Sequence, residues 1–341
     1  MQKPSDQIKT LRPSKNRVPS LILSFTAALM LVLTSLNSAA NAQTWPSKPI
    51  RVVVPAPAGS APDIAARLIA EKLAPLWGQA VQIDNRPGAG GIIAMENVRG
   101  AAADGHTLVF AHAGAVLLTP KLLKAARYDP VVDFATLGLV VDAPMMIVTA
   151  ADNPKPTAAD LIAAAKADSG GVAMGSPEQS TLPYLVAHQL AQDTGVKFLH
   201  VPFGQPTMGI QALVKGDVKY YIDGIAPLLP HIASGRLKAV ALTSERPLPG
   251  LETTPLLKNT VPGFAAVGWF ALFGPKATPG DIAAQINHDL NQVLANDEVI
   301  KRMHSLSLFP NPKSPADSLA FIKSEVTRWA AVIDKLGLQP Q

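Results

Sequence analysis

The chain has 341 residues with 30 basic and 25 acidic side chains, and it contains no cysteine, which excludes a disulfide framework, a thiolate metal site and a lipid-bearing cysteine. Its first 42 residues hold five of the basic side chains and one acidic one, so the other 299 residues have a net charge near +1. A net charge this close to zero gives no electrostatic indication that the protein binds nucleic acid or an anionic membrane.

The N-terminal segment has the three parts of a secretory signal. A basic stretch ends at Arg17, an uncharged and mostly apolar block runs from Leu21 to Leu36, and small residues follow up to Ala42. An uncleaved anchor is the alternative, but the block is shorter than the ~20 residues that a membrane span needs. We therefore expect export and cleavage after Ala42.

Short β-branched runs then alternate with segments rich in alanine and leucine. This alternation is typical of α/β folds with parallel sheets covered on both faces. A chain of 299 residues exceeds the usual single core and predicts two domains. The strand-like runs are Ile50–Val54, Val81–Asp84, Thr107–Ala111, Met146–Thr149, Phe198–Val201, Val218–Ile222 and Ala239–Thr243.

Two stretches are interpreted as crossings between the domains. They are 137–148, interrupted by Pro144, and 267–274. The predicted division is a signal peptide over 1–42, a first domain made of 43–140 and 267–341, and a second domain over 141–266.

The first loop of interest is "PAPAGSAPD", Pro55 to Asp63, between a strand-like run and a helix-like one. Gly59 permits an unusual backbone angle, and Pro62 fits the first turn of a helix. The N–H groups of a first turn lack helical partners and have the positive end of the helix dipole behind them. They are suited to a carboxylate or a phosphate.

Two motifs of catalysis or phosphate binding are absent from the sequence, and a dinucleotide-binding motif is incomplete. No loop has the P-loop spacing, and neither Ser60 nor Ser176 lies in a G-x-S-x-G elbow. "NRPGAGG" has Ile93 where a dinucleotide fingerprint needs its third glycine. Its glycines are interpreted as a turn into a helix beginning near Ile92, with cleft lining as the alternative.

The second loop of interest is the start of "MGSPEQSTLPYLVAHQL", Met174 to Leu190. Ser180 or Thr181 is expected to cap the helix that follows. The more specific hypothesis is that two helix N-termini, one from each domain, face each other and hold one carboxylate between them.

An ordered series of motifs resembles the Bug-type periplasmic solute-binding receptors of tripartite tricarboxylate transporters. The motifs cover nearly the whole chain after the leader. They are "WPSKPIRVVVPAPAGSAPDIAAR", "DNRPGAGG", "AADGHTL", "YDPVVDF", "HVPF", "LPHIASGRLKAVALTSERP", "PGFAAVGWFAL" and "KATP".

The resemblance implies a two-domain clamshell, or Venus flytrap, in which each domain is a mostly parallel sheet flanked by helices. It implies a monomer in the periplasm that captures a small organic acid and delivers it to two membrane permease subunits, without catalysis, cofactor, metal or nucleic acid. The implied ligand-binding residues are Ala56, Ala58, Gly59, Ser60, Ala61, Asp63, His112, Ala113, Ser176, Gln179, Ser180, Thr181, Phe203 and Asp223.

The chain departs from the family pattern at several of these positions. Ala56 stands where an aromatic residue is usual, which predicts room for a ligand larger than a four-carbon dicarboxylate unless water or Tyr184 fills the space. Glu178 is unexpected in a site for an anion. It either points to solvent or meets a cationic or hydroxyl group at the far end of the ligand.

Two other functions stay open on the sequence. One is a ligand sensor for a membrane signalling partner, which uses the same fold. The other is a secreted α/β hydrolase in which Ser176, His112 and Asp223 form a triad. The seven histidines include no pair at i, i+4 and no HExxH motif, so a zinc site is not expected.

Overall fold

Ten strands form one continuous array in a computed structural model that describes residues 45–154 and 156–340. The leader and the expected cleavage site after Ala42 lie outside the described residues. The strands are β1 (Ile50–Val54), β2 (Val81–Asn85), β3 (Thr107–His112), β4 (Phe134–Ala150), β5 (Val172–Pro177), β6 (Phe198–Phe203), β7 (Tyr220–Gly224), β8 (Leu237–Leu242), β9 (Val267–Pro275) and β10 (Phe309–Pro310).

The first half of the array has the order β2-β1-β3-β9-β4. β1 pairs in parallel with β2 and β3, whereas β9 is antiparallel to both β3 and β4. Four of these five strands therefore run in one direction and β9 runs against them. The short β10 pairs with the outer edge of β4.

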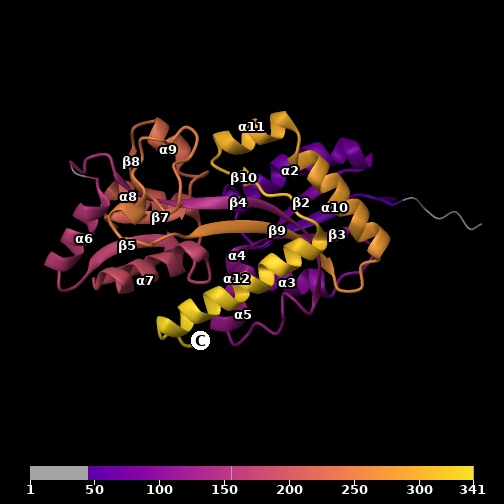
Figure 1. Ribbon diagram of the computed structural model, residues 1–341, viewed down its shortest axis with the longest axis horizontal. Helices are drawn as coiled ribbons and strands as arrows, with labels where there is room; N and C mark the ends of the chain where they lie inside the picture. Colours follow the sequence, from indigo (N-terminus) through magenta and orange to yellow (C-terminus); the bar gives the residue numbers. More distant parts are fainter. Residues whose placement is uncertain (1–44, 155, 341) are drawn as a thin grey trace, which may run out of the picture. The chain divides into compact units, whose positions relative to one another are not determined.

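The second half has the order β8-β4-β7-β5-β6. β5 pairs in parallel with β6 and β7, and β4 is antiparallel to β7 and β8. β4 is thus shared by the two halves and is the one strand that runs against its neighbours in the second (Figure 1). The chain enters the second half along β4 and returns along β9.

Pro144 does not interrupt β4, although the sequence suggested a break there. The residue lies where β4 changes partner: Pro144 is the last residue paired with β9, and Met145 is the first paired with β7. A proline, which has no N–H to donate, is tolerated at such a change of pairing.

Helices cover both faces of each half. They are α2 (Ala61–Trp77), α3 (Ile92–Arg99), α4 (Ala113–Leu117), α5 (Thr119–Leu122), α6 (Ala158–Ala167), α7 (Leu182–Thr194), α8 (Pro206–Lys215), α9 (Leu229–Ala233), α10 (Gly280–Leu294), α11 (Asp297–Ser305) and α12 (Pro315–Lys335), with short 3-10 turns at Ala89–Gly91 and Leu257–Asn259.

The side chains of the strands alternate between separate cores. In β1, Val53 packs with residues of α3, α4 and α12, while Val52 and Val54 pack under α2 and α10. A third cluster fills the other face of the second half, around Met146 and Tyr221. Because side chains on both faces of the sheet are buried, the strands appear in the sequence as continuous apolar runs.

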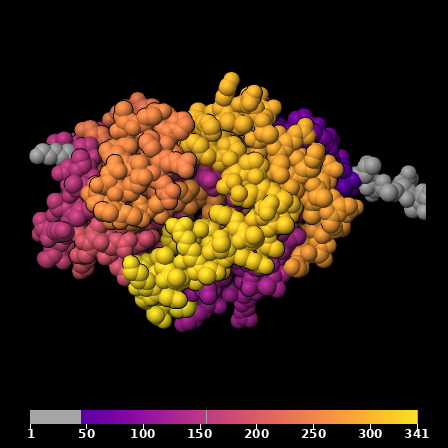
Figure 2. Space-filling model, viewed as in Figure 1, coloured from indigo at the N-terminus to yellow at the C-terminus, as the bar shows by residue number. Residues whose placement is uncertain are grey.

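The last helix, α12, joins the two halves. Ser318 Oγ near its start accepts a hydrogen bond from the Leu139 N–H of β4, and Lys335 at its end pairs with Asp193 of α7 at 3.2 Å. In Figure 2 the yellow atoms of this C-terminal segment lie across the visible face. Within the described residues, no helix combines the length and the apolar character that crossing a membrane requires.

Candidate ligand-binding site

A cavity lies at the carboxyl ends of strands from both halves. Its walls come from the ends of β1, β2, β3, β5, β6 and β7 with the loops that follow them, from the middle of β4 and from the beginning of β9. The volume that the centre of a water molecule can reach is about 100 Å³. One buried water needs only ~10–15 Å³ by this measure, so the cavity has space for a small organic molecule.

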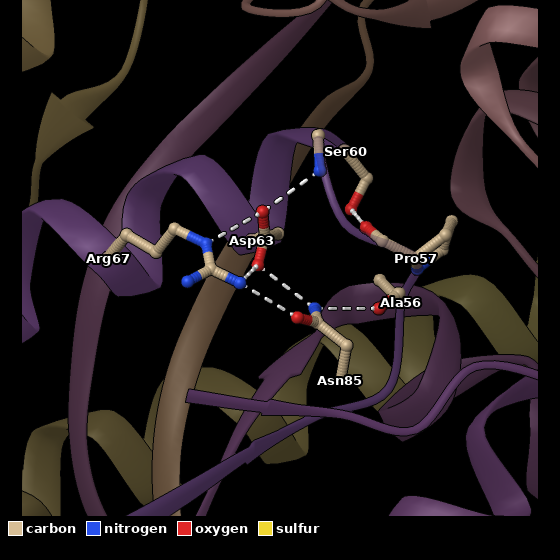
Figure 3. Close-up of polar contacts among 7 residues, drawn as sticks. Ala56, Pro57, Ser60, Asp63, Arg67 and Asn85 are labelled. Atoms are coloured by element: carbon tan, nitrogen blue, oxygen red, sulfur yellow. Dashed lines mark hydrogen bonds and ion pairs between the residues drawn. The ribbon is translucent and has the colours of Figure 1, made fainter. Parts of the chain in front are cut away.

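The loop after β1 is held from behind by Asp63 (Figure 3). The carboxylate accepts hydrogen bonds from the Gly59 N–H, from Asn85 Nδ2 and from the Arg67 guanidinium, all at 2.9 to 3.1 Å. Burial alone would raise the pKa of Asp63, but these donors together hold it below its ordinary value. Asn85 Nδ2 also donates to the Ala56 carbonyl, so the network fixes both ends of the loop.

This network decides which N–H groups at α2 are available to a ligand. The Gly59 N–H donates to Asp63 and the Ser60 N–H donates to the Pro57 carbonyl, so both groups have partners within the protein. The N–H groups of Ala61 and Asp63, in the first turn, have no acceptor among the described residues. Ala61 lines the cavity.

The loop after β5 presents a second helix start. Neither expected hydroxyl caps α7: Thr181 Oγ1 donates back to the Glu178 carbonyl at 2.7 Å, and Ser180 Oγ has no hydrogen-bond partner among the described residues. Ser180 is only 4% exposed and lines the cavity. Its own N–H and that of Leu182 are likewise without an acceptor in the described chain.

The two halves touch on both sides of the cavity at glycines. A methyl group on Gly90 would lie 2.6 Å from Ser180 Oγ, and one on Gly114 would overlap the Ser180 carbonyl oxygen. On the other side, a methyl group on Gly224 would lie 2.9 Å from the Ala61 side chain. The starts of α2 and α7 therefore lie at one cavity because glycine lets the backbones approach closely.

His112 lines the cavity but uses both ring nitrogens within the protein. Nε2 is 3.1 Å from the Pro55 carbonyl, and Nδ1 accepts from the Ala115 N–H at 3.2 Å, which caps α4. With Nδ1 as acceptor the ring is the neutral Nε2–H tautomer, and burial lowers its pKa to about 4.

The three residues of the hypothetical hydrolase triad do not form one. Ser176 Oγ donates to the Pro177 carbonyl, both His112 nitrogens have other partners, and Asp223 accepts from Tyr221 and Gly224. Ser176 is fully buried and does not line the cavity.

Two acidic side chains line the cavity, and the described residues place no lysine or arginine there. Asp223 accepts hydrogen bonds from Tyr221 OH at 3.1 Å and from the Gly224 N–H at 2.7 Å, yet burial raises its pKa to about 7. Glu178 is half-buried, and burial also raises its pKa, against an opposing contribution from the Gly90 N–H. Glu178 thus lines the cavity while part of its side chain stays exposed.

The apolar part of the wall includes Ala56, Phe203 and Trp269. Tyr184 does not fill the space beside Ala56, because its ring packs on His188 with centroids 4.5 Å apart. Trp269 belongs to the wall, and its Nε1 donates to Glu325 of α12 at 3.2 Å.

Nine of the fourteen expected site residues line the cavity: Ala56, Ser60, Ala61, His112, Ala113, Ser180, Thr181, Phe203 and Asp223. The other five lie outside the lining: Ala58, Gly59, Asp63, Ser176 and Gln179. Lining residues that the sequence did not single out include Met145 and Gly114. Gly114 sits in a helix and has no turn signature, so only the contact with Ser180 shows its role.

A metal site receives no support from the part of the chain that the structure describes. No three side chains of histidine, aspartate or glutamate are grouped there as metal ligands.

Comparisons with known proteins point to one family. The model of the tripartite tricarboxylate transporter family receptor, TctC, matches residues 65–338. The protein BugT of Bordetella pertussis is 30% identical over 314 residues, which cover 91% of this chain and 95% of BugT. The Bug resemblance inferred from the motifs is confirmed by these matches.

Solved structures show the same fold. Rpa4515 of R. palustris with adipate superposes with a TM-score of 0.84 at 28% identity, over 87% of this chain and all of that one. The periplasmic binding protein BugD gives 0.82 at 30% identity, again over 87% of this chain and all of BugD. The predicted α/β fold of periplasmic binding proteins is thereby confirmed.

Proposed function

Because the chain belongs to the tripartite tricarboxylate transporter receptor family, we propose that it captures a small organic acid in the cavity described above and delivers it to a tripartite transporter. The observation that carries this proposal is the meeting of two helix starts with free N–H groups at one cavity. No protein cation is needed for such a site, because main-chain donors and the helix dipole favour an anion.

The carboxylate is held by donors from both halves in this proposal. α2 supplies the Ala61 N–H group, and α7 supplies the Leu182 N–H together with the N–H and hydroxyl of Ser180. Neutral donors avoid burying an arginine, whose desolvation is costly. The adipate in Rpa4515 supports a carboxylate as ligand.

The two halves act as the two domains of a clamshell in this proposal. The boundaries are those expected from the sequence, with 43–140 and 267–341 in the first domain and 141–266 in the second. The pairing supports them, since β4 changes partner at Pro144 and β9 begins at Val267. A ligand bound to the starts of α2 and α7 stabilises the closed arrangement.

The cell-biological part of the proposal follows the family. The receptor is a periplasmic monomer released by cleavage after Ala42, it works with two membrane permease subunits, and it has no catalytic role. N-terminal sequencing of the exported protein tests the cleavage directly, with Gln43 as the expected first residue.

Native mass spectrometry of the protein purified from periplasm, followed by a thermal-shift screen of organic acids, tests ligand capture. A ligand of the folded state raises the apparent stability with the logarithm of its concentration over its dissociation constant. A carboxylate that raises the melting temperature supports the proposal. A complete panel of acids without any shift, on protein shown by mass to be empty, contradicts it.

Two variants locate the carboxylate. Ala61→Pro removes a free N–H at the first position of α2, where proline fits the backbone, and Ser180→Ala removes the unpartnered hydroxyl. Each is expected to weaken binding by about 1.5–3 kcal/mol, the usual contribution of a hydrogen bond to a charged group. Ala158→Pro at the first position of α6, outside the cavity lining, is the matched control. Unchanged affinity in both cavity variants contradicts this placement.

A further inference from the structure

The cavity has the wrong balance of charge for a ligand that is only an anion. Its described lining contains the carboxyl groups of Glu178 and Asp223, while His112 is neutral and has both nitrogens engaged. Nothing on the wall neutralises these acids. An anionic ligand would add a third negative group to the same small space.

Asp223 is built into the wall as an acceptor. It is 6% exposed, at the end of β7, and its two oxygens each take one hydrogen bond, from Tyr221 OH and from the Gly224 N–H. An ionised carboxylate has about four acceptor positions, so positions remain for a donor in the cavity. Gly224 packs on Ala61, which places Asp223 beside the start of α2.

Glu178, in the loop just before α7, contributes a second hydrogen-bond acceptor to the cavity wall. Apart from the influence of the Gly90 N–H, no donor in the described chain pairs with its carboxylate. Close by, Ser180 Oγ is 4% exposed, lines the cavity and has no partner among the described residues. The wall thus offers unsatisfied polar groups of both kinds, donors at the helix starts and acceptors at the two acids.

We propose that the ligand carries a protonated nitrogen as well as a carboxylate, and that Asp223 and Glu178 bind the nitrogen while the starts of α2 and α7 bind the carboxylate. This inference rests on the proposed function and narrows it to zwitterionic acids such as amino acids. The ligand's ammonium group supplies the positive charge that the wall lacks. A bound cation also restores the ionised forms of the two acids, which burial otherwise disfavours.

Sets of ligands that differ only in the nitrogen test the inference. 6-Aminohexanoate, hexanoate and adipate have the same chain length, and L-norleucine matches hexanoate with the amine on the α carbon. We expect at least one amino acid of this panel to bind about tenfold or more tightly than hexanoate and adipate at pH 7.5, as charge-assisted hydrogen bonds predict. Isothermal titration gives the affinities.

Two isosteric variants assign the preference to its residues. Asp223→Asn and Glu178→Gln are expected to reduce the preference for the amino acid over hexanoate, because each removes a negative charge that attracts the ammonium group and repels a ligand that is only an anion. Lowering the pH from 8 to 6 is expected to weaken binding of the amino acid, because Asp223 then takes up a proton, and to do so less in Asp223→Asn.

The outcomes separate the two proposals. If hexanoate or adipate binds as tightly as the amino acids at pH 7.5, the zwitterion is wrong and carboxylate capture stands. A preference that persists unchanged in both variants also overturns the inference. If no member of the panel and no other carboxylate binds, the proposed function itself fails.

Discussion

The Glu325 carboxylate accepts a hydrogen bond from the indole Nε1 of Trp269 at 3.2 Å. The same oxygen accepts from Trp329 Nε1 at 3.1 Å, and the other oxygen is 3.3 Å from the Arg328 guanidinium. Since Trp269 belongs to the cavity wall, α12 sets the position of part of the wall from outside it.

Removing this carboxylate is expected to cost both stability and affinity. Glu325→Leu leaves two buried indole N–H groups without an acceptor, at about 1–3 kcal/mol each. Glu325→Gln keeps an acceptor oxygen and should lose less stability and less ligand affinity than Glu325→Leu. Urea unfolding and ligand titration of the two variants check this. A Leu variant with the stability of the unaltered protein would show that the indoles find other acceptors.

The glycine contacts across the cavity predict an effect on binding without an effect on folding. Gly114→Ala adds a methyl group within α4, where alanine favours a helix, but the group overlaps Ser180. We expect the two halves to be held apart and the apparent affinity to fall in proportion to the closed fraction, by about tenfold or more.

Gly195→Ala is not a suitable control for this variant, because Gly195 has a φ of 65°. Gly280→Ala is preferable, since Gly280 lies outside the cavity lining and a methyl group there meets no atom within 4 Å. Small-angle scattering of Gly114→Ala with saturating ligand should show a more open protein. Equal affinity in Gly114→Ala and Gly280→Ala is the result that contradicts the contact.

The Asp63 network predicts a dependence of stability on acid pH. Because the pKa of Asp63 is lower in the folded protein than the ordinary 3.8, its contribution is complete above that value and is lost as the pH falls through the folded pKa. Asp63→Asn should cost about 1–3 kcal/mol at pH 7, and the difference from the unaltered protein should shrink below pH ~4. Thermal melts across pH 3–7 measure this.

Asp217→Asn is the matched control, because Asp217 is exposed and its side chain has no hydrogen bond within the described chain. A difference between Asp63→Asn and the unaltered protein that stays constant down to pH 3 would show that the network contributes through packing and not through the ionised carboxylate.

The space beside Ala56 predicts a limit on ligand size. Ala56→Phe is expected to weaken binding of a six-carbon acid by about tenfold, or about 1.4 kcal/mol, while the melting temperature without ligand changes little. Titration of the best six-carbon ligand against its three-carbon analogue checks this. If both bind Ala56→Phe as they bind the unaltered protein, the side chain does not enter the cavity.

The sequence predicted the alternation of strands and helices well. β1 was predicted at its observed bounds, because a run of isoleucine and valine buried on both faces is typical of a strand. β4 was predicted as two pieces because a proline normally ends a strand, and the change of partner at Pro144 depends on β9, which lies more than 120 positions further along the chain.

The site was predicted in its outline and not in its details. Helix starts follow from local sequence, so the loops that carry them were found. The Asp63 carboxylate accepts directly from the Gly59 N–H and also from Asn85, a residue of the next strand, and no local signal predicts the contact with Asn85. The Gly90 N–H that influences the pKa of Glu178 comes from the other half, and local sequence does not predict this proximity either.

The position of β9 between β3 and β4 also governs the order in which the chain acquires its structure. During synthesis, residues 50 to 150 emerge without the strand that joins their two sheet edges, and that strand is complete only at Pro275. Contacts so distant along the chain form slowly, because the intervening loop must first be closed. The first half therefore remains unfinished, with β3 and β4 unpaired along facing edges, until about four fifths of the polypeptide has been made.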